Sequence, residues 1–293
     1  MTALELARFA LYADLGLAFG VPAAAILTGA RHGPPVLRPF LVGTAVLGLP
    51  LSMIGYLLLV AQMAGTGIGD LDWQLVRDLT INSAVGMAFA VRVVVLCVAV
   101  AIGLIARRGQ VWWTACAGIA LATLAWSGHA AAGEGALALP RLGADIAHLL
   151  ASSIWLGALV WFLVQLWRRG GTSNDTKAAL TRFAGVGSVL VMVLGATGLV
   201  NLWFVAPVGV WANLALTDYG KLLVLKLVLF AGMLALAALN RFVLVPMLNS
   251  SGSGEDARRG RLGLRLSIGL ELCAACAILA LVASLGLIDP GSA

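Results

Sequence analysis

The stretch INSAVGMAFAVRVVVLCVAVAIGLI, residues 81–105, decides the fold class of this chain. It carries one charge, Arg92, and exceeds the about 20 apolar residues that cross a hydrocarbon core of roughly 30 Å. Because a bilayer core offers no water to backbone groups and the run is continuous rather than alternating, it is predicted to be an α-helix. Seven similar stretches accompany it. The eight predicted spans are residues 4–28, 40–64, 81–105, 111–128, 143–166, 183–205, 220–240 and 264–288.

The composition agrees with a membrane protein. Of the 293 residues, 61% are hydrophobic and 11% are charged, and the mean hydropathy is +1.00, whereas a soluble domain is typically about 25% charged. The first span is too long for a cleaved signal peptide, and Glu5 precedes Arg8 where a signal peptide has a basic cluster. We therefore expect an all-α polytopic helix bundle, with residues 1–293 forming a single transmembrane domain.

The distribution of cations predicts the orientation. The loops after the first, third, fifth and seventh spans, counted with Arg265 at the start of the eighth span, contain 13 of the 19 Lys and Arg residues, and such loops face the cytoplasm. The other loops carry most of the acidic residues, so both termini are predicted to be external. The formal net charge of +6 is thus a topology signal and gives no reason to infer nucleic-acid binding.

Two of the three histidines face each other across one predicted external loop. His129 follows the fourth span, and His148 lies roughly 8 Å below the external surface on the fifth. Asp145, His148, Ser152 and Trp155 recur at a helical spacing, which places them on one stripe. A carboxylate one turn from a histidine can accept its second ring N–H and leave the other nitrogen free for a metal. A histidine at a helix end is more often a hydrogen-bonding group than a ligand, but this pairing predicts a metal site with Asp145 orienting His148.

Methionine would narrow the choice of metal. Imidazole suits Cu, Zn, Fe and Ni, whereas a thioether adds a preference for Cu(I). Met53, Met63 and Met87 fall in the middle or outer half of the bundle and are candidate additional ligands, with the external Met1 beside them. Methionines in a helix bundle more commonly fill gaps in the core.

Several ordered motifs resemble the copper resistance protein D (CopD) family, most densely over residues 125–245. The motifs are Gly128-His129-Ala130, Asp145-x-x-His148-Leu149-Leu150-Ala151, Trp155-Leu156-Gly157, Arg182-Phe183, Thr197-Gly198-Leu199-x-Asn201, Thr217-x-Tyr219-Gly220-Lys221 and Asn240-Arg241. The resemblance implies an inner-membrane protein that moves copper from the periplasm toward the cytoplasm, with the motif histidines carried over to His129 and His148. It also implies a periplasmic CopC-like copper carrier as a separate partner. Residues 1–80 match less distinctly.

Several charged residues lie well inside the predicted spans, where a lipid-facing charge would cost about 2.5 to 3.5 kcal/mol near the centre. They are Asp14, Arg92, Lys226 and Glu271. They must face the interior. Asp14 and Arg92 share a depth of roughly 15 Å, which favours an ion pair between them, with either a structural role or a role in a gate or proton relay.

The cysteines fall in the inner half of their helices. They are Cys97, Cys116, Cys273 and Cys276. Thiolates bind Cu(I), so an inner relay is conceivable. Buried cysteines are more often small hydrophobic residues, and disulfides are not expected on a reducing side of the membrane.

Three functions fit these residues. The first is a copper permease or copper-binding protein, with the copper ion captured externally by His129 and His148. The second is a b-type haem protein that uses the same histidines as axial ligands. The third is an assembly subunit that delivers copper to another protein without import. No phosphate-binding loop or phosphorylated-aspartate motif is recognisable, so ATP hydrolysis and enzymatic activity are not expected.

The charge asymmetry generates a labelling prediction. In a variant without the native cysteines, we expect Ser292→Cys to react with an impermeant thiol reagent added to intact cells and Ser253→Cys to stay unlabelled, because the positive-inside rule places residue 253 in the cytoplasm. Labelling of residue 253 in intact cells would overturn the predicted topology.

Overall fold

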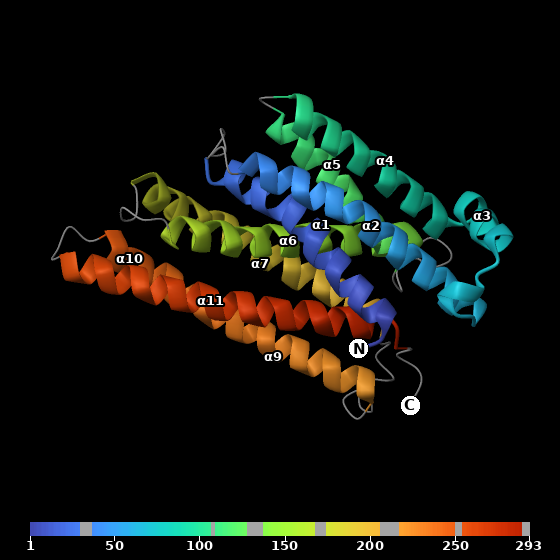
Figure 1. Ribbon diagram of the computed structural model, residues 1–293. Helices are drawn as coiled ribbons and strands as arrows, with labels where there is room; N and C mark the ends of the chain where they lie inside the picture. Colours follow the sequence, from blue (N-terminus) through green and yellow to red (C-terminus); the bar gives the residue numbers. More distant parts are fainter. Residues whose placement is uncertain are drawn as a thin grey trace.

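The computed structural model describes residues 1–29, 37–106, 109–127, 137–167, 174–205, 217–249 and 254–288, and these residues form helices and short connections only (Figure 1). The all-α prediction is confirmed. The elements are α1 (Ala3–Leu27), α2 (Leu37–Ala64), η1 (Ile68–Asp70), α3 (Trp73–Asn82), α4 (Ala84–Ile105), α5 (Gln110–Ala122), η2 (Thr123–Ser127), α6 (Ala138–Trp167), α7 (Asn174–Val205), α9 (Asp218–Leu239), the π-helical turn η5 (Asn240–Leu244), α10 (Val245–Asn249) and α11 (Gly254–Leu285).

Hydroxyl side chains set several helix starts. The side-chain oxygens of Thr2, Ser83 and Thr217 each accept a hydrogen bond from the backbone N–H three residues later, at 3.0 to 3.2 Å. These caps satisfy N–H groups that have no partner within the helix. Ser83 therefore divides the predicted span 81–105, because α3 ends at Asn82 and α4 begins at Ala84.

Seven helices in the described part of the chain are long and apolar enough to cross a membrane. The fourth predicted span, residues 111–128, differs from the others. Its α-helical part lies in α5, which has 13 residues, and the chain then tightens into the 3₁₀ segment η2. A 3₁₀ helix rises about 2.0 Å per residue, so α5 and η2 together still extend over roughly 30 Å.

Both ends of the described chain lie at the same end of the bundle. A Cβ atom at Gly286, just after α11, would overlap the guanidinium of Arg8 near the start of α1. Arg8 also contacts Ser127 at the end of η2. We call this the terminal end, and we call the opposite end, where Arg38 and Arg182 lie, the basic end. Because both ends of the described chain lie at one end of the bundle, the chain crosses the bundle an even number of times. The segment formed by α5 and η2 therefore crosses it as the seven longer helices do (Figure 1).

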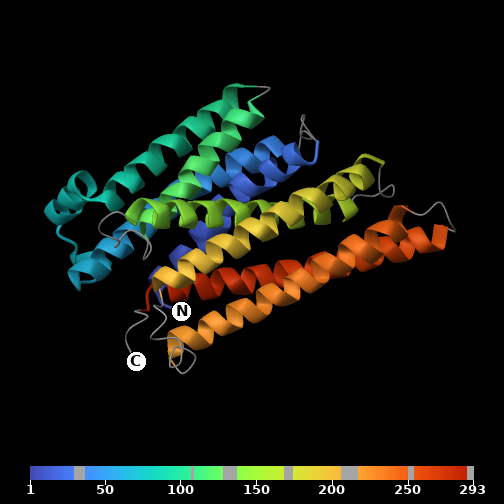
Figure 2. The same ribbon diagram turned by 180° about the vertical axis from the view of Figure 1, so that it is seen from behind.

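Helices α1 and α6 form the centre of the bundle. Figures 1 and 2 show α2, α4 and α5 on one side of this pair, with α9 and α11 on the other and α7 packed along α6. The two central helices touch backbone to backbone. A Cβ at Gly20 would overlap the carbonyl of Ser153, and one at Gly157 would overlap the backbone of Gly20. Small residues permit such an approach between membrane helices.

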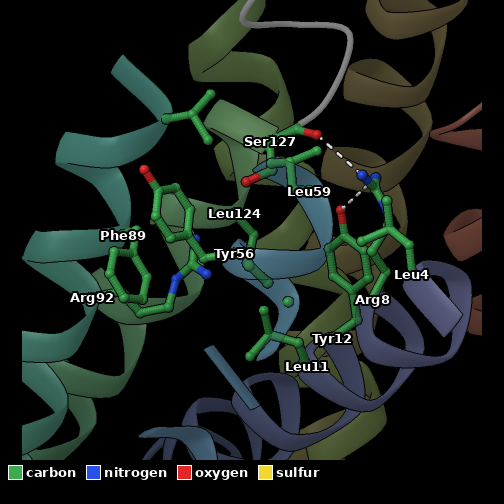
Figure 3. A pocket seen from close by; sticks show the side chains of 12 residues that line it. Leu4, Arg8, Leu11, Tyr12, Tyr56, Leu59, Phe89, Arg92, Leu124 and Ser127 are labelled. Carbon is green, nitrogen blue, oxygen red and sulfur yellow. Dashed lines mark hydrogen bonds between the residues drawn. The ribbon is translucent and has the colours of Figure 1, made fainter. Parts of the chain in front are cut away.

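Two buried arginines hold η2 in place. Arg92 on α4 donates to the Thr123 hydroxyl at 2.7 Å and to the Thr123 carbonyl at 3.3 Å. Arg8 donates to the Ser127 carbonyl at 3.1 Å, and it lies beside Tyr12 (Figure 3). Both arginines therefore satisfy backbone or hydroxyl oxygens where the regular helix ends.

The predicted Asp14 and Arg92 ion pair is wrong. The described residues contain no ion pair between these two side chains, and the Oδ2 atom of Asp14 is buried without a hydrogen-bond partner. Asp14 faces α2, where a Cβ at Gly48 would lie 3.0 Å from its Oδ2 atom. The two residues share a depth, but depth does not determine the direction in which each helix presents its side chains.

The contact between α1 and α6 generates a stability prediction. We expect Gly157→Ala to lower the free energy of unfolding by about 1 to 3 kcal/mol, because the new methyl group collides with backbone that has no room to move. Gly143→Ala on the same helix is the control, since no atom lies within 4 Å of its Cβ position. Equal stability of the two variants during unfolding in detergent would contradict this account.

The contact of Arg92 with Thr123 generates a second prediction. In a double-mutant cycle, Arg92→Gln and Thr123→Val should couple by about 0.5 to 3 kcal/mol, because they share a buried hydrogen bond. Asp14→Asn and Arg92→Gln should instead add to within about 0.5 kcal/mol. Stronger coupling of Arg92 to Asp14 than to Thr123 would restore the ion pair and refute the hydrogen-bond assignment.

Candidate functional site

His148 on α6 faces α7, where its Nδ1 atom lies 2.9 Å from the Thr197 hydroxyl oxygen. The Thr197 hydroxyl donates its proton to the Val193 carbonyl at 2.6 Å. Since a hydroxyl has only one proton, its oxygen must accept from the Nδ1–H group of His148. The Nε2 atom then keeps its lone pair, which is the form that can bind a metal ion.

His148 lines a cavity of about 490 Å³ between α6, α7, α9 and α11. Most lining side chains are apolar, and the ammonium of Lys226 is the one charged group that the described residues contribute to the lining. Ser152 and Trp155 also line it, which confirms that these two residues share a face of α6 with His148. An apolar cavity with a few polar groups is a typical ligand site.

Asp145 belongs to the same region. Its carboxylate lies near Lys226 and Tyr219, which are both on α9. The described partner of the His148 Nδ1 atom is Thr197, so sequence spacing along α6 alone missed this contact. The sequence did contain an indication that Thr197 is important, because Thr197 belongs to one of the motifs that carry the family resemblance. The influence of Asp145 on His148 stays a prediction.

His129 falls within residues 128–136, which are outside the described part of the chain, as His32 is. Ser127, the last described residue before this segment, lies at the terminal end of the bundle beside Arg8. Ser127 lines a small cavity with Arg8 and Tyr12 (Figure 3), and Tyr12 also lines the cavity of His148. Tyr12 thus lines both cavities, and the pairing of the two histidines stays a prediction.

The predicted methionine ligands lie elsewhere. Met53 and Met63 on α2 and Met87 on α4 are all exposed on the outside of the bundle, as Met1 is. They neither line the cavity nor fill the core. Met233 on α9 does line the cavity and is 6% exposed. Its spacing of seven residues from Lys226, two helical turns, is the signal that could have found it.

The cysteines line neither of the larger cavities. All four are free thiols, and Cys97, Cys273 and Cys276 are exposed while Cys116 is half-buried. The expectation that they are buried small residues is therefore wrong for three of them. The i, i+3 spacing of Cys273 and Cys276 is real, but it places the pair on an outward face of α11.

Glu271 marks a second polar position inside the bundle. Its side chain is 1% exposed and lines a separate cavity of about 480 Å³ that is nearer the basic end. The Oε1 atom accepts a hydrogen bond from the Asn240 amide at 2.5 Å. Asn240 begins the π-helical turn η5, and such turns occur often at functional sites. The sequence prediction that Glu271 faces the interior is confirmed.

The chemistry available at His148 is that of a partial metal site. Within the described ranges, no group of three or more His, Cys, Asp or Glu side chains is close enough to hold a metal ion. His148 offers one nitrogen lone pair, and the same cavity contains the thioether of Met233. Nitrogen and thioether donors suit copper, and completing the coordination requires a further donor.

Comparison with known proteins assigns the family. Residues 177–285 match the family described as "Copper resistance protein D", and residues 1–139 match "Copper resistance protein D-like, N-terminal domain". The second match extends the resemblance to the region that looked least distinct in the sequence. No solved structure matches this chain.

Two relatives agree with the family matches. The chain is 36% identical to "Copper resistance protein D" of Pseudomonas syringae pv. tomato, over 97% of this chain and 95% of that protein. It is 28% identical to "Inner membrane protein YebZ" of Escherichia coli (strain K12), over 57% of this chain and 55% of that protein. The chain is a multi-pass membrane protein that belongs to the copper resistance protein D family.

Proposed function

We propose that this protein is a copper permease of the inner membrane. His129 and His148 capture the ion at the terminal end, which faces the periplasm, and the ion then moves toward the basic end and the cytoplasm. The observation that carries the proposal is the hydrogen bond that the Nδ1–H group of His148 donates to the Thr197 hydroxyl, because it leaves Nε2 able to bind a metal inside a cavity. Membership of the copper resistance protein D family supports copper as the metal.

The other residues of the site have supporting roles in this proposal. Thr197 fixes the tautomer and the ring orientation of His148, and Asp145 compensates the positive charge of Lys226 beside an arriving cation. Met233 is an additional soft donor in the same cavity. Arg8 and Arg92 hold the segment from which the chain departs toward His129.

Copper reaches and leaves this protein through other proteins. We propose a periplasmic CopC-like carrier as the donor, because the terminal end is the proposed capture face. The inner-membrane location is supported by the name of the relative from E. coli. The protein acts as a transporter and not as an enzyme, so the driving force must come from the gradient of an ion or from the partners.

Copper binding by purified variants tests the proposal. We expect His129→Ala and His148→Ala each to abolish most copper binding, with the double variant little worse than either, because two ligands of one site act as a unit. Thr197→Val and Asp145→Asn should weaken affinity by about 10 to 100-fold, as is typical for groups that orient a ligand. Stoichiometry and affinity are measured on variants that stay folded in detergent.

His32→Ala is the matched control, since His32 follows α1 in a basic loop that the positive-inside rule places across the bilayer from His129 and His148. A double histidine variant that binds copper as well as the parent would refute the external site. Uptake of copper into proteoliposomes by the parent then separates import from binding. Binding without uptake would favour the third candidate, an assembly subunit that delivers copper without import.

A b-type haem protein is the second candidate, and two observations favour it. The cavity of His148 is mainly apolar, as a porphyrin requires, and the ammonium of Lys226 could pair with a propionate. His129 and His148 would then be the axial ligands. A reduced-minus-oxidised spectrum of purified protein decides between the candidates, because haem gives Soret and α bands and copper does not.

A further inference from the structure

The two large cavities are stacked along the same four helices. Leu194 on α7 lines the cavity of His148, and Val191, one turn further along, lines the cavity of Glu271. On α11, Ala275 lines the cavity of His148 and Glu271, about one turn away, lines the other cavity. We call the cavity of His148 the outer chamber and the cavity of Glu271 the inner chamber. They adjoin at one level of the bundle, between the terminal end and the basic end.

Trp155 is the residue that lines both chambers. Its side chain is 5% exposed, and its ring packs edge to face against Phe230 of α9, with 6.4 Å between the ring centroids and 61° between the planes. Phe230 lines the outer chamber. Two aromatic rings from facing helices therefore occupy the level at which the two chambers meet.

The indole N–H of Trp155 points to a link between this level and Glu271. Trp155 and Glu271 both line the inner chamber, and the buried Nε1 atom of Trp155 makes no hydrogen bond with any residue in the described ranges. The carboxylate is otherwise held by Asn240. A buried N–H without a hydrogen bond is costly, and Glu271 is the carboxylate in this chamber that can accept from the indole.

The inner chamber also differs from the outer one in charge. Glu271 and Arg241 are the two charged side chains that the described residues contribute to its lining. The Arg241 guanidinium donates to the Ala184 carbonyl at 3.1 Å and to the Ser188 hydroxyl at 2.5 Å, which ties it to α7. Glu271 is thus the anionic group available to a cation that enters this chamber.

We propose that the two chambers are successive parts of one cation route, that Trp155 is the barrier between them, and that Glu271 holds this barrier closed. The inference rests on the proposed transport function and adds the position of its gate. Trp155 blocks the passage while its N–H is drawn to the carboxylate. A cation in the outer chamber must displace the indole before it reaches Glu271.

Thiol accessibility tests the barrier without copper. In a variant whose four native cysteines are replaced by alanine, Ser152→Cys reports on the outer chamber and Ala237→Cys on the inner one. A hydrophilic thiol reagent is added to proteoliposomes from the side that labels Ser152→Cys. We expect the parent to protect Ala237→Cys from this side, and Trp155→Ala to raise its labelling rate at least tenfold.

Trp161→Ala is the matched control, because Trp161 is a buried tryptophan of the same helix, 6% exposed, that lines neither chamber. Phenylalanine variants at both positions repeat the comparison if the alanine variants fail to fold. Glu271→Gln should raise labelling of Ala237→Cys as well. If this variant melts at the same temperature as the parent, a purely structural role of Glu271 does not explain the increase.

Two results would overturn the inference. One is equal labelling of Ser152→Cys and Ala237→Cys in the parent, since no barrier would then exist. The other is equal labelling of Ala237→Cys in the Trp155 and Trp161 variants. Because these measurements use no metal, their outcome is independent of copper uptake by the parent, which tests the proposed function.

Discussion

The backbone contact between Gly20 and Gly157 is the constraint on which the rest of the bundle depends. Lipid tails are as apolar as leucine side chains, so the hydrophobic effect does little to bring two membrane helices together. Close packing must do it instead, and here α1 and α6 approach until neither glycine has room for a methyl group. The position of α6 then determines where its cavity-facing side chains lie, from His148 to Trp155.

Three polar side chains in the described part of the bundle bond to hydroxyl or carbonyl oxygens rather than to opposite charges. Arg92 uses the Thr123 hydroxyl, Arg8 uses the Ser127 carbonyl, and His148 uses the Thr197 hydroxyl. A buried ion pair must repay the desolvation of two charges. A hydroxyl that already donates within its own helix can accept a hydrogen bond without the desolvation of a second charge. Such a hydroxyl also determines which tautomer a bonded histidine adopts.

The outer chamber combines features that suit a metal with features that suit an amphiphilic ligand. A free imidazole nitrogen and a thioether favour copper, while the apolar lining and Lys226 resemble a cofactor pocket. Membership of the copper resistance protein D family favours copper as the ligand in the proposed function. In the proposed function, the nearby Asp145 carboxylate offsets the repulsion between the Lys226 ammonium and a cation in the same cavity.

Local properties of the sequence were enough to predict the class of fold and part of the site. Hydropathy alone predicted the helices, because in a bilayer each apolar stretch must satisfy its own backbone hydrogen bonds. Helical spacing placed His148, Ser152 and Trp155 on one face, since that relation lies within one helix. The shortened helix α5 escaped prediction, because a 3₁₀ segment such as η2 has the same hydropathy as an α-helix.

Relations between helices were decided by the tertiary structure. The rotation of each helix about its axis separates Asp14 from Arg92 despite their common depth, brings Thr197 to His148, and turns Met53, Met63 and Met87 away from the cavity. Sequence position specifies how deep a side chain lies but not which neighbour it meets. That choice depends on how closely the backbones pack, and in this protein the glycines of α1 and α6 determine it.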